Sequence, residues 1–245
     1  MKIALIVPSR ERMTLRKNLI NSVIETVDDT NNITLYMGVD DDDPTKEEIT
    51  ELSKKHSFME IVKINNGGKF LGMGKLVNLC SKEVTEDVVG LMGDDSVFIT
   101  KGWDTKIIEE FKNCPKDNFK MVYVNDGHYG NRIATTPFLH RVYMGINGYL
   151  MREEFMGDGG DKWLQRMFFV FGRLKYRKDI LVEHRHWLFG KRERDGVTNN
   201  LLQFNNPVSN AKQWGALREI RLEEAQRISK KLDIQCDFSS LEDLK

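Results

Sequence analysis

Four short apolar runs, each followed by polar or turn-forming residues, recur along the first half of the chain. They lie at residues 3–7, 33–39, 61–64 and 88–92. Runs of this length are typical of strands buried inside a parallel sheet. Between the first two runs, apolar residues recur at helical spacing over residues 15–27, and another helix is expected after Gly72. Strands that alternate with helices over short connections predict an α/β fold with a doubly wound, mostly parallel sheet flanked by helices.

The same patterns continue to the C-terminus. Thr45 followed by Glu48 has the spacing of a capping box and predicts the start of a helix. Further elements are expected as helices over 102–111, 161–171 and 211–232 and as strands over 121–124, 140–145 and 180–182. We therefore expect one domain over residues 1–205. A C-terminal helical extension over residues 206–245 would pack on that domain or form a homodimer contact.

The composition excludes several classes of protein. With 245 residues, of which 40% are hydrophobic, the chain can bury a full core. Its 37 basic and 37 acidic residues cancel, which argues against a uniformly basic surface for non-specific nucleic-acid binding. Cys80, Cys114 and Cys236 are scattered without metal-binding spacing, and no apolar run could span a membrane. We expect a soluble, cytosolic protein.

The strongest chemical signal is the pair Asp94 and Asp95, which follows Gly93 directly after an apolar run. In open α/β sheets, ligands bind just beyond the carboxyl ends of the strands. Two adjacent carboxylates repel each other and are stabilised when they share a hard divalent cation. The pair therefore predicts a metal site, and a solvated Gly-Asp-Asp turn is the alternative interpretation.

Polar groups suited to a nucleotide follow other strands in this half. A carboxylate such as Asp40 can accept a hydrogen bond from the imide of uracil, and Lys75 can pair with a diphosphate. The alternatives are an exposed acidic turn over residues 40–43 and a solvated position for Arg10. The candidate nucleotide-binding residues here are Pro8, Ser9, Arg10, Asp40, Gly74 and Lys75.

These segments together resemble the GT-A fold glycosyltransferases. The order is strand–Pro–Ser–Arg, strand–Asp–Asp, Asn–Gly–Gly before a helix, and strand–Gly–Asp–Asp. Over residues 3–191 it is similar to the family-two-like group, including small single-domain members from bacteriophages. The resemblance implies a Rossmann-like GT-A fold in which Asp94 and Asp95 hold Mn²⁺ or Mg²⁺ on the diphosphate of a nucleotide sugar. Ser96 stands where the family's DxD motif has its last acidic residue, so the two aspartates must act without it.

Two further aspartates, Asp158 and Asp161, lie in a glycine-containing segment that leads into a helix. The resemblance implies that a carboxylate at this place in the sequence order takes the proton from the acceptor hydroxyl of an inverting reaction. Asp161 is the candidate general base and Asp158 its substitute. Helix capping is the alternative role for Asp161.

His184 and His186 follow the apolar residues 180–182 at alternate positions, so they point to the same side of an extended segment. Imidazole is an acceptable ligand for manganese, and the resemblance implies that a histidine here completes the metal shell. Lys191 lies in a basic segment, residues 190–195, that could close over the diphosphate; a solvated charge run is the alternative.

Together these expectations describe a metal-dependent glycosyltransferase that moves a sugar from a nucleoside diphosphate sugar, here a UDP-sugar, to an acceptor hydroxyl. The acceptor would be a hydroxymethylated base in phage DNA, modified in the host cytoplasm, or a glycan. The basic stretch 173–194 favours DNA, whereas the zero net charge does not. A sugar nucleotidyltransferase is the alternative enzyme, although the Gly-rich signature of that class is missing after the first strand. A nucleotide- or DNA-binding module without catalysis is the non-enzymatic alternative.

Overall fold

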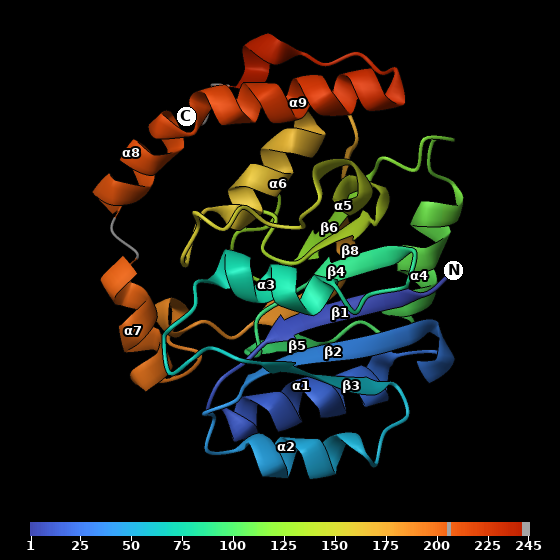
Figure 1. Ribbon diagram of the computed structural model, residues 1–245. Coiled ribbons are helices and arrows are strands. Elements are labelled where there is room, and N and C mark those ends of the chain that lie inside the picture. The colour runs from blue at the N-terminus through green and yellow to red at the C-terminus, as the bar shows by residue number, and fades with distance from the viewer. Residues whose placement is uncertain (205–206, 242–245) are drawn as a thin grey trace.

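A mixed β-sheet forms the centre of the protein in the computed structural model, which describes residues 1–204 and 207–241 (Figure 1). The strand order is β3-β2-β1-β4-β7-β6-β8-β5. The strands are β1 (Ile3–Pro8), β2 (Ile33–Asp40), β3 (Met59–Ile64), β4 (Val88–Leu91), β5 (Ser96–Phe98), β6 (Met121–Asn125), β7 (Pro137–His140) and β8 (Leu174–His184). The first four strands pair in parallel, as β8 does with β6, whereas β7 and β5 pair antiparallel with their neighbours. The mostly parallel α/β sheet predicted from the sequence is confirmed.

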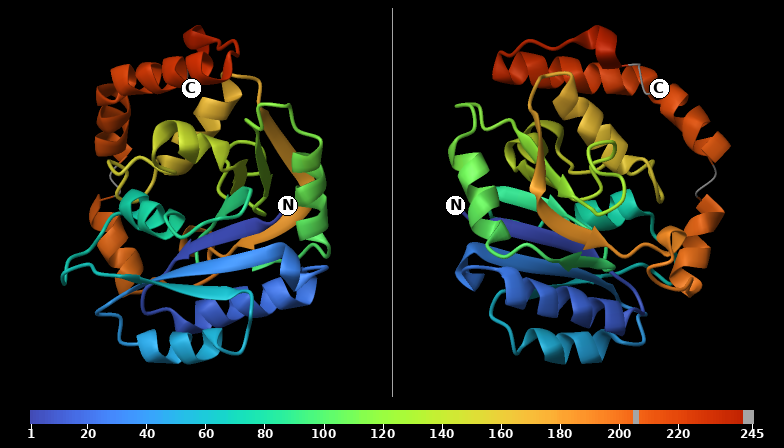
Figure 2. Two further views of the ribbon diagram at one scale, coloured as in Figure 1. Left: turned by 45° about the vertical axis from the view of Figure 1, so that its right-hand side comes forward. Right: turned by 180° about the vertical axis from the view of Figure 1, so that it is seen from behind.

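Helices cover both faces of the sheet. They are α1 (Met13–Thr26), α2 (Lys46–Ser53), α3 (Met73–Ser81), α4 (Trp103–Lys112), α5 (Val142–Asn147), α6 (Gly160–Phe169), α7 (Gly196–Phe204), α8 (Pro207–Ala216) and α9 (Arg218–Leu232), with 3₁₀ turns η1 (Thr30–Asn32), η2 (Trp187–Phe189) and η3 (Phe238–Leu241). In Figure 1, α1 and α2 lie below the sheet, and α3, α5 and α6 lie above it. Figure 2 shows α9 running across the end of α6.

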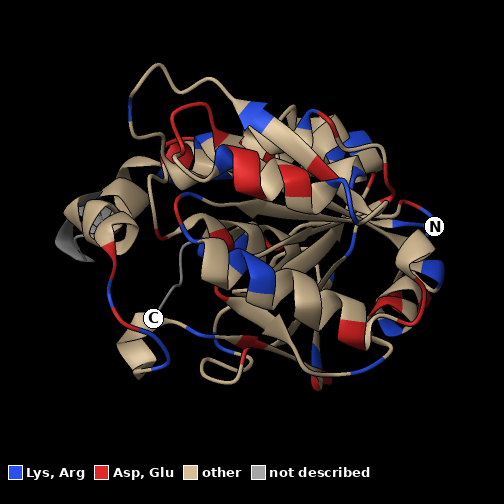
Figure 3. Ribbon diagram, turned by 90° about the horizontal axis from the view of Figure 1, so that it is seen from below, with Lys and Arg blue, Asp and Glu red and all other residues tan. Residues whose placement is uncertain are grey.

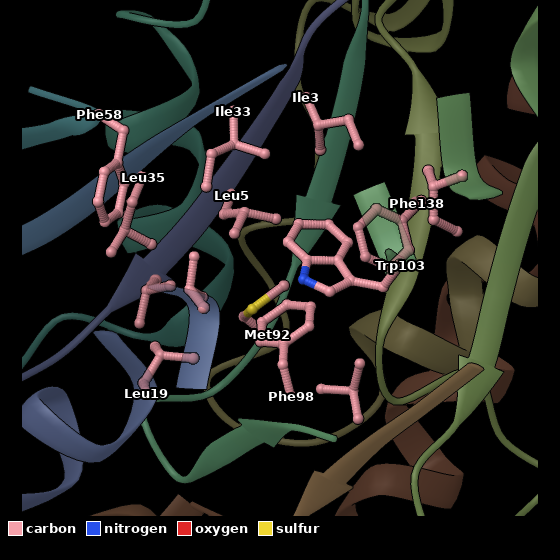
Figure 4. Close-up of a cluster of buried hydrophobic side chains, with 14 of the residues drawn as sticks. Ile3, Leu5, Leu19, Ile33, Leu35, Phe58, Met92, Phe98, Trp103 and Phe138 are labelled. Carbon is pink, nitrogen blue, oxygen red and sulfur yellow. The ribbon is translucent and has the colours of Figure 1, made fainter. Parts of the chain in front are cut away.

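Two apolar cores result because successive residues of a strand face opposite sides of the sheet. Leu5 of β1 packs in the core on the α1 and α4 side, together with Leu19 and Trp103 (Figure 4). The next residue, Ile6, belongs to the core on the α3 and α6 side, which also contains Trp163. Each of these side chains is almost fully buried, which contributes about 1.5–3 kcal/mol for a residue such as leucine.

Local expectations differ from the structure at Thr45 and over residues 140–145. Thr45 precedes α2 without capping it, because its hydroxyl group bonds Arg16 and Asp43 instead, so the capping box does not form. The strand expected over residues 140–145 ends at His140, and α5 follows. Tyr143 of α5 is buried in the core on the α3 and α6 side. Gly148 ends the helix with a left-handed φ of 78°.

The C-terminal helix expected over residues 211–232 is instead divided into α8 and α9, which meet at Leu217. Gly215, a poor helix former, lies close before the break. The domain boundary expected between residues 205 and 206 falls on residues outside the described ranges. Ala225 and Ile228 of α9 are buried in the same core as α6.

The surface carries both signs of charge, as the balanced composition requires. Figure 3 shows acidic and basic residues interspersed on the side covered by α1 and α2. Across residues 1–204 and 207–241, the helices are all too short or too polar to cross a lipid bilayer.

The chain reverses its winding direction at β1. From β1 it moves outward to β2 and β3, and then returns through α3 to β4 on the other side of β1. Such a reversal opens a crevice at the carboxyl ends of the strands, where ligands bind in open α/β sheets. Asp40 ends β2 at this edge, and Ser9 and Asp94 follow β1 and β4, which end there too.

Candidate active site

A cavity of about 260 Å³ opens at this edge of the sheet. Its walls come from the ends of β1 and β4, from α3 and α6, from the segment after β8, and from α7. Three predicted pairs of chemical groups therefore share one space. They are Asp94 and Asp95, Asp158 and Asp161, and His184 and His186.

Asp94 is almost completely buried at the bottom of the site, and protein groups bind both of its carboxylate oxygens. Ser9 Oγ donates to Oδ2 over 2.6 Å, and Arg12 Nη1 donates to Oδ1 over 3.0 Å. Burial outweighs these two contacts and raises the pKa of Asp94 above its ordinary value. The carboxylate is thus fixed in position by β1 and by the turn that follows it.

The Asp95 carboxylate contacts His184, at the end of β8, and Arg192, in the segment that follows β8. Its Oδ1 lies 3.2 Å from His184 Nε2, and its Oδ2 accepts a bond of 3.0 Å from Arg192 Nε. Burial works against the charge, but the contacts with His184 and Arg192 hold the pKa of Asp95 well below its usual range. His184 reaches this position because β8 pairs antiparallel with β5, which places His184 opposite Ser96.

Arg12 links the carboxylate pair to α7. Its guanidinium donates to Asp94, to both carboxylate oxygens of Asp195 at 2.7 and 2.8 Å, and to Thr198 Oγ1 at 2.9 Å. Arg192 donates to the same threonine oxygen over 3.0 Å. Both arginine side chains are about nine-tenths buried, and both line the cavity.

Four residues of this cluster were not predicted from the sequence. They are Arg12, Arg192, Asp195 and Thr198. Arg12 and Arg192 lie in the basic runs from which Arg10 and Lys191 were selected, so the charge pattern indicated the segments without distinguishing the residues.

The net charge of the cluster follows from these contacts. Three carboxylates, from Asp94, Asp95 and Asp195, face two guanidinium groups, so these five groups together carry one net negative charge. A diphosphate would be repelled by that charge, whereas one added divalent cation would make the net charge positive.

A divalent cation fits between Asp95 and His184. Ligand oxygens lie about 2.1 Å from Mg²⁺ in near-octahedral geometry, so neighbouring ligand atoms of one ion are about 3 Å apart. The distance of 3.2 Å between Asp95 Oδ1 and His184 Nε2 matches this requirement. Within the described residues, no three His, Cys, Asp or Glu side chains converge on one point, so phosphate oxygens and water would complete the shell.

His186 and Asp94 fit direct metal binding less well. His186 Nδ1 accepts a bond from the backbone N–H of Leu188 and so caps η2. Burial, and then the neighbouring His184, lower the pKa of His186 to about 4, which leaves the ring neutral at pH 7. Asp94 already has a partner on each oxygen.

Asp158 and Asp161 lie on the side of the cavity formed by α6. Asp161 is in the first turn of α6, where its Oδ1 accepts a bond of 2.7 Å from the backbone N–H of Lys162. Desolvation by the cavity wall raises the pKa of both carboxyl groups above the ordinary value. A raised pKa makes a carboxylate a stronger base, so both residues keep the chemistry expected of a general base.

A fully buried ion pair supports the turn after β1. Arg16 Nη2 lies 2.6 Å from Asp43 Oδ2, and both side chains are completely buried. The same guanidinium donates to the hydroxyl and the carbonyl oxygen of Ser9. Arg16 thereby holds Ser9 in place to bond Asp94.

Asp40 lies beside the site, at the end of β2, and is not part of the cavity wall. Its Oδ2 accepts a bond of 2.9 Å from Arg10, which also pairs with Asp42. Its Oδ1 is buried without a hydrogen-bond partner in the described residues. Burial raises the pKa of Asp40 above its ordinary value. An acceptor without a donor fits the expected contact with a nucleobase imide.

The other predicted nucleotide-binding residues lie in different surroundings. Pro8 lines the cavity, whereas Lys191 is half-exposed and pairs with Glu183 over 3.1 Å. A Cβ atom added to Gly74 would lie 2.1 Å from the carbonyl oxygen of Arg152, so the glycine lets α3 pack against protein backbone rather than against a ligand. Lys75 is exposed and forms no ion pair with any residue that the structure describes.

Aromatic side chains from two segments pack together next to Trp187, which lines the cavity. His128 and Phe189 stack with ring centres 3.9 Å apart, and Tyr129 meets Phe189 edge-on at 5.4 Å. Trp187 lines the cavity and carries the Arg194 guanidinium 3.9 Å above its ring. We call these residues, His128, Tyr129, Trp187 and Phe189, the aromatic rim. Asp158 and Asp161 are among the charges that raise the pKa of Tyr129 after its burial, so this member of the rim lies near the base side of the cavity.

Comparison with known proteins places this geometry in context. The sequence model described as glycosyl transferase family 2 matches residues 5–195. Comparison with curated protein sequences gives no match.

Solved structures share the fold. The structure of S. aureus TarS 1–349 in complex with UDP-GlcNAc has a TM-score of 0.67 and 14% identity, covering 98% of this chain and 69% of TarS 1–349. Mannosyltransferase PcManGT from Pyrobaculum calidifontis, in complex with GDP-Man and Mn²⁺, has a TM-score of 0.61 and 12% identity, covering 76% of this chain and 57% of PcManGT. In another TarS 1–349 structure the aligned part is 59% of its length, less than two thirds. The expected GT-A fold is confirmed.

Proposed function

The chain belongs to glycosyl transferase family 2, and from this premise we propose that it transfers a sugar from a UDP-sugar to an acceptor hydroxyl in a metal-dependent, inverting reaction. The observation that carries the proposal is the single cavity lined both by the Asp94–Asp95 pair and by Asp161. A donor diphosphate near the first group and an acceptor hydroxyl near the second would bring the two reactants together.

The donor end is assigned to the cluster around Asp95. Asp95 and His184 would hold Mn²⁺ or Mg²⁺, in line with the Mn²⁺ named in the PcManGT complex. When bound, the ion would neutralise the charge that develops on the leaving diphosphate. UDP is proposed because the unpartnered oxygen of Asp40 suits the imide of uracil and because TarS was solved with UDP-GlcNAc.

The acceptor end is assigned to α6. Asp161, with Asp158 as the substitute, accepts the proton of the acceptor hydroxyl as its oxygen attacks the anomeric carbon. A bond from this oxygen to the anomeric carbon forms while the bond from that carbon to the diphosphate oxygen breaks. Attack from the side opposite the diphosphate inverts the configuration. The raised pKa of Asp161 supports the role of base.

The acceptor itself is proposed at the level of chemistry. The aromatic rim offers flat apolar faces beside the base, which suits an acceptor that presents a ring. A hydroxymethylated base in DNA and a glycan hydroxyl both meet this condition. A bacteriophage origin and a role in DNA modification have no support from the family match or the structural relatives, and both stay proposals.

The family match removes support from the two alternatives, the sugar nucleotidyltransferase and the binding module without catalysis. A turnover assay tests the proposal directly. The protein would be incubated with Mn²⁺ and a panel of UDP- and GDP-sugars, and released nucleoside diphosphate would be measured. Mass spectrometry of DNA and of glycans from cells that express the protein would then identify the acceptor. If the purified protein neither binds nor turns over any nucleotide sugar, the proposal is wrong.

A further inference from the structure

We propose that Arg12 exchanges Asp94 for the donor diphosphate when the metal ion binds, and thereby couples the two binding events. This inference rests on the proposed function, because it assumes a nucleoside diphosphate in the cavity. It assigns a new positioning and binding role to a residue that is distinct from the acidic pair and from the base.

The contacts of Arg12 leave it ready for a ligand. A guanidinium has five N–H groups, and the contacts with Asp94, Asp195 and Thr198 use four of them. The remaining N–H, on Nη1, has no partner among the residues that the structure describes. Because the side chain is about nine-tenths buried and lines the cavity, a ligand there can reach this group while bulk water is largely excluded.

The rest of the guanidinium is held from the other side. Asp195 accepts from Nε and Nη2, and it also accepts the backbone N–H of Thr198 over 2.7 Å at the start of α7. Thr198 Oγ1 in turn accepts from Arg12 and from Arg192. Arg12 can therefore give up its contact with Asp94 and stay in place through Asp195 and Thr198.

The charges explain why metal would trigger the exchange. A cation at the Asp95–His184 position would share the cavity with Asp94, and its positive charge would compete with Arg12 for the Asp94 carboxylate. A phosphate oxygen is then the stronger partner, because guanidinium binds phosphate through short, charge-assisted hydrogen bonds. Coupling of this kind is reciprocal, so the diphosphate would also strengthen metal binding.

Titration calorimetry with the substitution Arg12→Gln tests the exchange. The probe would be whichever of UDP, GDP, ADP and CDP binds the wild-type protein most tightly at saturating Mn²⁺, compared with its parent nucleoside. Loss of one charge-assisted contact should weaken binding of the diphosphate by about 10- to 100-fold and leave the affinity for the nucleoside unchanged. The substitution Arg177→Gln is the matched control, because Arg177 also bridges two carboxylates, Glu110 and Asp179, and does not line the cavity.

A second measurement separates exchange from a merely structural role. Titration of Mn²⁺ alone, followed by electron paramagnetic resonance, should give tighter binding to Arg12→Gln than to wild type, because the competing cation is gone. Affinity for metal and for diphosphate would thus change in opposite directions, which simple loosening of α7 cannot produce. Should Arg12→Gln melt too low for titration, Arg12→Lys serves instead, with a smaller loss of diphosphate affinity.

The outcomes are distinguishable. Equal selectivity of wild type and Arg12→Gln for the diphosphate over the nucleoside overturns the exchange and leaves the glycosyltransferase assignment intact. Weaker Mn²⁺ binding by Arg12→Gln also overturns it. Absence of binding of any nucleoside diphosphate to the wild-type protein would instead overturn the proposed function.

Discussion

Asp95 Oδ1 and His184 Nε2 lie 3.2 Å apart although 89 positions separate the two residues in the sequence. The antiparallel pairing of β5 with β8 creates this contact, because it sets Ser96 opposite His184. The donor end of the site therefore depends on the register of two strands at the edge of the sheet. A carboxylate and an imidazole at this distance are the natural place to test for metal.

The first prediction concerns the metal ion. Transfer and donor hydrolysis should vanish in excess chelator and return when Mn²⁺ is added, because the ion would offset the charge that develops on the leaving diphosphate. Asp95→Ala should lose several orders of magnitude in turnover while the circular dichroism spectrum stays unchanged. Full activity in chelator would contradict the metal assignment.

The second prediction concerns the nucleobase. UDP should raise the melting temperature more than ADP at equal concentration, because a ligand that binds only the folded state stabilises it more the lower its Kd is. Asp40→Ala should reduce the difference between UDP and ADP, since the unpartnered carboxylate oxygen is the proposed acceptor for the imide. Equal protection of the wild-type protein by both nucleotides would argue against uracil.

The third prediction concerns the general base. Asp161→Asn should bind metal and nucleotide sugar normally and lower kcat for transfer by about 10²–10⁴-fold, because the amide cannot accept the proton. Its side-chain oxygen can still accept the backbone bond from Lys162, so the start of α6 is preserved. If Asp161→Asn transfers sugar at the wild-type rate, Asp158→Asn is the next variant, and if neither slows transfer the inverting mechanism loses its support.

The fourth prediction links the same residue to stability. Burial raises the pKa of Asp161, so the folded state binds a proton more tightly there than the unfolded state does. The charged form is therefore destabilising at pH values above the folded-state pKa, and the cost disappears as pH falls below the unfolded-state pKa. Asp161→Asn should melt at a higher temperature than wild type at neutral pH, and this gain should shrink in acid. A lower melting temperature at neutral pH would indicate that capping dominates.

The fifth prediction concerns the aromatic rim. Trp187→Ala should raise KM for the acceptor more than KM for the donor, because Trp187 lines the cavity and belongs to the aromatic rim, whose Tyr129 lies close enough to Asp158 and Asp161 to be affected by their charges. Phe169→Ala is a suitable control, since Phe169 is an exposed aromatic residue on α6 that does not line the cavity. Equal effects on both substrates would mean that the tryptophan only supports the fold.

The sequence predicted β1 to β4 and β6 because local patterns determine them, whereas β5 and the first part of β8 were not expected. Apolar runs such as residues 3–7 become buried strands wherever they lie, and Gly93 followed by two aspartates indicates the end of a strand. The strand expected over residues 140–145 was wrong because a short apolar segment is compatible with both a strand and a helix. Here the segment forms a helix, in which Tyr143 packs into the core on the α3 and α6 side.

The candidate site was predicted only in part, because some of its contacts join residues that are far apart in the sequence. Asp94, Asp95 and Asp161 can be picked out from the glycines beside them in the sequence. Arg12 cannot, because its partner Asp195 lies 183 positions away and the pairing exists only after α7 packs beside the end of β1. A basic run in a sequence does not say which of its arginines turns inward.

The long separations within the arginine cluster also determine when the site can form. Arg12 and Asp195 are 183 positions apart, and Asp95 and Arg192 are 97 apart, so each of these two contacts closes a long loop at a cost in chain entropy. During synthesis the N-terminal strands emerge first, and Arg12 and Asp95 stay without these partners until residues 184–198 leave the ribosome. A nascent chain that ends before Arg192 would therefore carry an intact β1–β4 sheet and an unassembled active site.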